Sequence, residues 1–196
     1  MSTFTVNVTE QRTSDMVNAI ATAHHCEAGA TIALSGALAA ALGQAVANGT
    51  LDEGATGAAA DAARQMQLRL TDVRARLLAL ADQDATAIGE FVRLRDSGQP
   101  LKGYEILCDG PRDMAEQVLT AAGLMQAFRQ HVCERTHDDL EFALTLMSGV
   151  ARAAMLLLDS NLRIWPLPEL VAKYNPAVID LAARIDALQP VRRIRG

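Results

Sequence analysis

Two places in this sequence carry side chains suited to proton transfer. In a long helical pattern, Asp84 lies on the same stripe as a row of apolar residues. Burying a carboxylate there costs free energy unless the group is paired or has a function. The segment 136–139 (THDD) places His137 beside Asp138 and Asp139, where a helix is expected to begin. A carboxylate with a shifted pKa, or an imidazole that titrates near neutral pH, can move a proton.

Each set also has a purely structural interpretation. Asp84 could cap or hydrogen-bond a neighbouring helix. Asp138 could be a helix N-cap, with Asp139 placed favourably against the helix dipole. Spacing along the chain does not choose between these interpretations and the functional ones.

No metal site is predicted. Cys133 and His137 are four residues apart and could share a helix face, and His24, His25 and Cys26 are adjacent. No second C-x-x-C or H-x-x-x-H accompanies them. The signatures of dinucleotide-binding, phosphate-loop, zincin and hydrolase-elbow proteins are also missing from the sequence.

Composition indicates which elements must position these residues. Of the 196 residues, 50% are hydrophobic but only 4% are aromatic, and alanine dominates the apolar set. Such a composition favours closely packed helices. We therefore predict an all-α fold, an antiparallel bundle of five to seven helices in a single domain spanning residues 1–196. Apolar periodicity and capping signals predict helices near residues 13–23, 29–48, 58–96, 111–135, 138–162 and 176–190.

Glycine recurs every seventh residue in the helix predicted from Gly29 to Asn48. Gly29, Gly36 and Gly43 leave one face nearly free of side chains, although glycine inside a helix costs up to about 1 kcal/mol relative to alanine. This face must therefore be approached closely, either by another helix or by a ligand.

Two further segments are not predicted to be helical. Phe4, Val6 and Val8 alternate with polar residues, so the arm 1–12 could hold a short β-strand, or it could be a polar terminus. Residues 97–110 form a long break between helices, in which Lys102 and Tyr104 could contact a ligand.

Charge and cysteine content limit the class of partner. With 18 basic and 23 acidic residues the net charge is −5, which disfavours nucleic acid. Residues 28–47 are uncharged over the length of a membrane span, but their Ala, Gly, Ser and Thr content favours a buried helix of a soluble protein. Three cysteines without C-x-x-C spacing, and a start without a leader pattern, predict a cytoplasmic protein that does not bind membranes.

Several motifs resemble the cyclodeaminase and methenyltetrahydrofolate cyclohydrolase family. The stretch 24–50 is similar to the family's P-G-G-G-S turn and the Ala-rich helix after it, through G-A-L at 36–38 and V-A-N at 46–48. Residues 80–87 (LADQDATA) resemble its D-x-D-A-x-A-F turn, with Asp84 as the second acid, and 111–115 (PRDMA) resemble its P-L-x-x-A helix start. Counting back from Asn161, which resembles the family's I-N-L ending, places Asp139 on the aspartate of its S-D-V-G-V-A segment. The resemblance covers residues 23–162.

The resemblance implies a homodimeric, all-helical enzyme of one-carbon metabolism with a tetrahydrofolate or related pterin as substrate carrier and no tightly bound cofactor. It assigns catalysis to Asp139 and Asp84, expected to meet in one cavity, and we add His137 from its place in the sequence. Substrate binding is expected at Gly29 and Gly36 and at Glu27, which stands in the altered glycine turn, with Lys102 and Tyr104 from the loop. The alternative is a non-catalytic dimeric scaffold or pterin-binding relative that has lost this turn and uses its glycine face only for helix packing.

Overall fold

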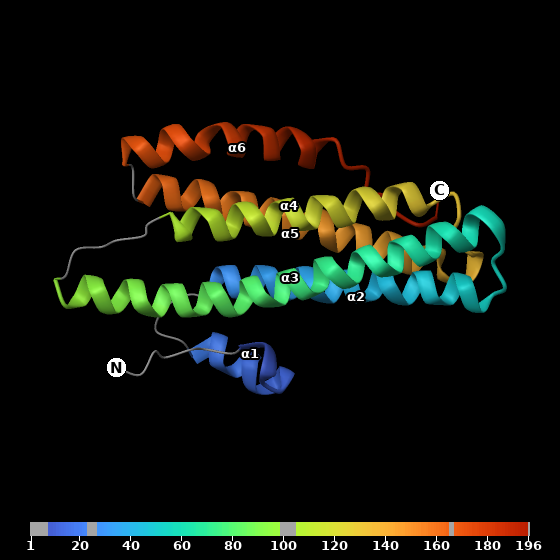
Figure 1. Ribbon diagram of the computed structural model, residues 1–196, viewed down its shortest axis with the longest axis horizontal. Coiled ribbons are helices and arrows are strands. Elements are labelled where there is room, and N and C mark those ends of the chain that lie inside the picture. The colour runs from blue at the N-terminus through green and yellow to red at the C-terminus, as the bar shows by residue number, and fades with distance from the viewer. Residues whose placement is uncertain (1–7, 23–26, 99–104, 165–166, 196) are drawn as a thin grey trace.

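The computed structural model describes residues 8–22, 27–98, 105–164 and 167–195. Its α-helices run antiparallel to one another along most of the chain, which confirms the predicted all-α bundle (Figure 1). Within the described residues there are six: α1 (Thr13–Thr22), α2 (Ala28–Asp52), α3 (Gly57–Asp96), α4 (Ile106–Phe128), α5 (His137–Ile164) and α6 (Pro168–Asp186). Two 3-10 turns, η1 (Val8–Glu10) and η2 (Glu134–Thr136), precede α1 and α5.

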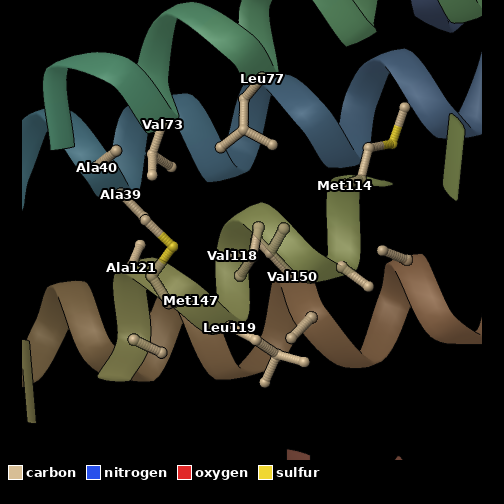
Figure 2. Close-up of a cluster of buried hydrophobic side chains, with 14 of the residues drawn as sticks. Ala39, Ala40, Val73, Leu77, Met114, Val118, Leu119, Ala121, Met147 and Val150 are labelled. Atoms are coloured by element: carbon tan, nitrogen blue, oxygen red, sulfur yellow. The ribbon is translucent and has the colours of Figure 1, made fainter. Parts of the chain in front are cut away.

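The core forms where α2, α3, α4 and α5 meet. Alanines 39 and 40 of α2 lie opposite Val73 and Leu77 of α3, with Val118 of α4 and Met147 of α5 completing the cluster (Figure 2). Small residues on α2 let the larger aliphatic side chains of three other helices approach its backbone. A Cβ added at Gly43 would meet Met125 and Leu70, so this glycine serves close helix packing.

The α4 boundary differs from the prediction that Pro111 opens this helix. α4 begins at Ile106, and Pro111 lies inside it, buried. A proline has no N–H, so the carbonyl of Leu107, four residues earlier, loses its helical partner. Asn161 of α5 takes that place, since its Nδ2 donates to the Leu107 oxygen at 2.6 Å. Contact between two helices thus satisfies a carbonyl that the sequence of α4 alone leaves free.

The last helix also begins earlier than predicted. α6 starts at Pro168, at the first helical position after the extended residue Leu167, and Pro176 lies inside the helix rather than at its start. Leu170, Tyr174, Leu181 and Ile185 form one buried stripe on both sides of Pro176. Their packing against the bundle outweighs the cost of the interrupted hydrogen bond.

α2 continues past its predicted end at Asn48 to Asp52, and a Cβ added at Gly49 would meet Thr136 of η2. In α5 the buried carboxylate of Glu141 accepts two hydrogen bonds from Arg129, at 2.6 and 2.7 Å.

The N-terminal arm is held to α3. The backbone N–H and hydroxyl of Thr9 both donate to the Asp82 carboxylate, at 3.1 and 2.8 Å. Val8 lies in the 3-10 turn η1 rather than in the strand considered from the sequence, and Phe4 and Val6 lie outside the described residues. α1 follows its predicted bounds closely.

Two stretches, α2 and residues 134–164, are long and apolar enough to cross a membrane. Half of the most apolar window of each is buried inside the bundle. Core helices of soluble proteins have the same length and composition, so this is weak evidence for a membrane.

Candidate functional site

Asp84 lies against the first turn of α2. The backbone N–H of Ala30 donates to Asp84 Oδ2 at 3.0 Å. Glu27, the residue at the N-cap position of α2, makes no side-chain capping bond. A carboxylate from α3 therefore performs the capping that α2 lacks from its own chain segment, which confirms the structural interpretation of Asp84.

Because Gly29 has no side chain, the Asp84 carboxyl group can lie directly against the backbone of α2. A Cβ at this position would overlap the Asp84 carboxyl group itself. The sequence predicted that Gly29 lets something approach closely, and the nearest group is this side chain. Gly29 and Asp84 thus form one unit at the start of α2.

Burial raises the pKa of Asp84 from 3.8 to about 6, the hydrogen bond from Ala30 opposes this rise, and the negative charge of Glu27 adds to it. A carboxylate at a helix N-terminus ordinarily has a lowered pKa, because the helix dipole and the free N–H groups favour its charge. Here the loss of hydration outweighs both effects. A carboxyl group with a pKa this close to neutral is well suited to exchanging a proton.

A cavity of about 250 Å³ lies beside the same stretch of α3. Polar side chains at its edge come from α3 and an apolar one from the start of α4. The lining residues are Asp82, Gln83, Thr86, Ala87, Glu90 and Ile106. Asp84 is not among them, since it points from α3 toward α2. Sequence analysis did not identify this side of α3 as a candidate site, although the spacing of residues 83, 86, 87 and 90 places them on one helix face.

The second predicted aspartate lies at the other end of the bundle. Asp139 is in the first turn of α5, directly after η2. Thr136 of η2 contacts Gly49, and Gly49 is nineteen residues along α2 from Ala30. At 1.5 Å per residue this separates the two ends by about 30 Å. The prediction that Asp84 and Asp139 share a cavity within one chain is therefore wrong.

The remaining predicted residues are scattered. His137 begins α5 and is exposed, with Nδ1 3.5 Å from Asp138 Oδ1 on the surface. Gly36 lies in the core, where an added Cβ would meet Leu77, Val118 and Val150, so it serves close helix packing, and its contact with substrate stays a prediction. Glu27 is half-buried beside Asp84. Lys102 and Tyr104, like His24, His25 and Cys26, lie outside the described residues.

Metal-ligating side chains do not gather in the described part of the chain, where no group of three or more His, Cys, Asp or Glu residues could hold an ion. The arrangement around Asp84 offers a different chemistry. One carboxylate oxygen accepts a hydrogen bond from a backbone N–H, and the raised pKa of the group suits it to proton exchange.

Comparison with known proteins gives the context of this site. No curated protein matches the chain. A family model described as formiminotransferase-cyclodeaminase matches residues 14–177. That span includes α1 from its second residue and all of α2 to α5, and therefore both Asp84 and the start of α2 that it caps. The chain thus belongs to the formiminotransferase-cyclodeaminase family of folate one-carbon metabolism.

Proposed function

We propose that this protein catalyses a cyclohydrolase or cyclodeaminase reaction on the one-carbon unit of a reduced folate or related pterin. The observation that carries this proposal is the Asp84 carboxylate, which is half-buried against Gly29 and has a pKa of about 6. At pH 7 about one such carboxyl group in ten is protonated, so both forms are available. A group with a pKa near the working pH is efficient in general acid and base catalysis.

Both reactions need a proton to be taken up and returned at one carbon between two nitrogens. In the hydrolysis, water adds to the methenyl carbon and gives one proton to Asp84, which returns it to the ring nitrogen as the carbon–nitrogen bond breaks. The proton left on the added hydroxyl group goes to solvent as that group becomes the formyl carbonyl. In the cyclisation, the second folate nitrogen attacks the formimino carbon and gives its proton to Asp84, which passes it to the departing ammonia. The carboxylate charge also stabilises the cationic methenyl bridge.

A cofactor-free assay tests the proposal. Purified protein is mixed with methenyltetrahydrofolate, and loss of the near-ultraviolet absorbance is followed. The enzyme is expected to accelerate this loss, with a rate that depends on an ionisation near pH 6. No acceleration, together with no binding of any reduced folate by calorimetry, would contradict the proposal.

The alternative function is a non-catalytic scaffold or binding module. The observation that favours it is the glycine face of α2, because Gly36, Gly43 and Gly49 all contact side chains of other elements of the chain. Under this alternative Asp84 is only a helix cap, and replacing it changes stability alone.

Gly29→Ala tests whether the position of Asp84 matters for the reaction, because it leaves the carboxyl group itself unchanged. The added methyl group overlaps the Asp84 carboxyl group, so Asp84 must move away from its place against α2. We expect the rate of methenyltetrahydrofolate hydrolysis to fall by about 10- to 100-fold, because small displacements of a catalytic group are costly. Gly123→Ala is the matched control. It lies in α4 with open space around an added Cβ, and it should keep full activity.

A further inference from the structure

The first turn of α4 is separated from the rest of that helix by a proline. α4 begins at Ile106, and Pro111 follows Gly110 inside it. A proline disfavours the helical conformation of the residue before it and leaves the carbonyl four residues earlier without its helical donor. Gly110 reduces the first effect, because it has no Cβ. Residues 106–110 therefore lack one of the hydrogen bonds that would tie them to the following turn.

Side chains from two other helices hold this turn in place. Asn161, near the end of α5, donates to the Leu107 carbonyl at 2.6 Å. The hydroxyl of Tyr174 in α6 donates to Asp109 Oδ1 at 2.8 Å. The start of α4, the end of α5 and the start of α6 lie at the same end of the bundle (Figure 1). Contacts between helices thus replace the hydrogen bond that the proline removes.

Ion pairs at the same turn are exposed and add little. Arg112 lies 3.0 Å from Asp109 and Lys173 lies 3.6 Å from Glu105, and every one of these side chains is at least a third exposed. Exposed ion pairs contribute little to stability. Tyr174, in contrast, is 1% exposed, and its ring packs in the core, so its hydroxyl has a fixed position. The two interhelical hydrogen bonds are therefore the contacts that keep the turn in place.

Two side chains of this turn would change their surroundings if it moved. Ile106 forms part of the wall of the 250 Å³ cavity beside α3. Cys108 is 2% exposed and belongs to the core. Burial raises the pKa of the Cys108 thiol, and the charge of Asp109 adds to this rise, so the group is held in its unreactive protonated form. An outward movement of the turn would therefore widen the cavity and bring Cys108 into contact with solvent.

We propose that residues 106–110 form a gate of the cavity beside α3, hinged where Gly110 meets Pro111. Asn161 of α5 and Tyr174 of α6 hold the gate closed. The gate opens as a local unit while the core of α2 to α5 and the second half of α6 stay folded. Its opening gives solvent or a small molecule access to the cavity and to the side of α3 that lines it. This inference does not depend on the proposed function.

Thiol labelling of the native protein measures the opening. The protein is treated with iodoacetamide, and the modified cysteines are identified by mass spectrometry, with the half-buried Cys133 at the other end of the bundle as an internal reference. When opening and closing are fast, the labelling rate follows the population of the open form. Cys108 is expected to react slowly, at a rate that changes little with urea below the unfolding transition, because a local opening exposes little surface. A rate that follows the urea dependence of global unfolding would overturn the gate.

Tyr174→Phe tests the contact from α6. It keeps the buried ring and removes only the hydroxyl that binds Asp109. We expect Cys108 to be labelled about tenfold faster, the effect of losing one hydrogen bond to a charged group. Arg184→Gln is the matched control, because it breaks the bonds to Glu116, at 2.7 and 2.8 Å, in the second half of the same helix, and it should leave this rate unchanged. Equal acceleration in both variants would show that α6 detaches as a whole and would contradict the gate.

Asn161→Leu tests the contact from α5. Leucine has nearly the size of asparagine but leaves the Leu107 carbonyl without its donor. Cys108 labelling is again expected to be about tenfold faster, while urea unfolding shows that the variant remains folded. Unchanged labelling in both Tyr174→Phe and Asn161→Leu would exclude these residues as the contacts that close the gate. A wild type without folate activity would count against the proposed function alone, because labelling measures only the movement of the turn.

Discussion

Asp84→Asn is expected to lower the rate of methenyltetrahydrofolate hydrolysis by about 10²- to 10⁴-fold, the usual contribution of a general acid–base group. The amide keeps an oxygen that accepts the hydrogen bond from Ala30, so the cap on α2 remains. It cannot exchange a proton, however. The residual rate should therefore lose its dependence on an ionisation near pH 6.

The same substitution is expected to stabilise the fold. Because the pKa of Asp84 is raised from 3.8 to about 6 in the folded protein, the folded state holds a proton that the unfolded state has released in this interval. The free energy of unfolding of the wild type therefore falls as pH rises from about 4 to 6. Asp84→Asn removes this loss. Above pH 6 it should be more stable than the wild type by on the order of 1–3 kcal/mol.

Urea unfolding of both proteins at pH 4 and pH 7.5 measures this difference. Asp72→Asn, which alters an exposed aspartate of the same helix, is the control and should change neither rate nor stability. If Asp84 were only a cap, its replacement would change stability alone and would leave the rate of methenyltetrahydrofolate hydrolysis unchanged. Stabilisation combined with lost activity is the signature of a site that sacrifices stability for function.

Apolar periodicity predicted the helices well because most of them bury one continuous stripe. The long pattern ending near Asp96 became α3, and its Leu70, Leu77 and Leu80 are fully or almost fully buried. The predictions that helices start at Pro111 and at Pro176 were wrong, since both prolines lie inside their helices. In both places packing against another helix outweighs a local signal, and at Leu107 a side chain from α5 supplies the missing hydrogen bond.

The candidate site could be predicted only in part, for a related reason. Periodicity placed Asp84 on the buried stripe of α3, and the alternatives named for it included the cap that it makes. Resemblance to the family identified Asp139, but neither pattern measures how far apart two residues lie along a bundle. That distance follows from the length of α2, which separates the Ala30 and Gly49 ends. Patterns along the chain likewise do not reveal the partner of the buried Glu141 carboxylate, because Arg129 directly follows another helix, α4.

Glu141→Ala is expected to destabilise the protein more than any surface substitution. The Glu141 side chain is 2% exposed and binds Arg129 through both oxygens. Arg129 also donates to the backbone oxygen of Gln189 at 2.6 Å, so this one guanidinium connects the end of α4, α5 and the C-terminal segment. Removing the carboxylate leaves the half-buried guanidinium of Arg129 without its counter-charge. The expected loss is about 3 kcal/mol, at the low end for a buried pair, because Arg129 is 27% exposed and can be partly hydrated.

Asp186→Ala provides the matched comparison for this pair. It removes the partner of Arg152 in an ion pair whose carboxylate is 71% exposed, and its cost should stay within about 1 kcal/mol. The free energy of unfolding in urea measures both variants. Equal losses would mean that burial does not distinguish the two pairs. A loss confined to Glu141→Ala would show that burial makes the pair of Arg129 and Glu141 the more stabilising of the two.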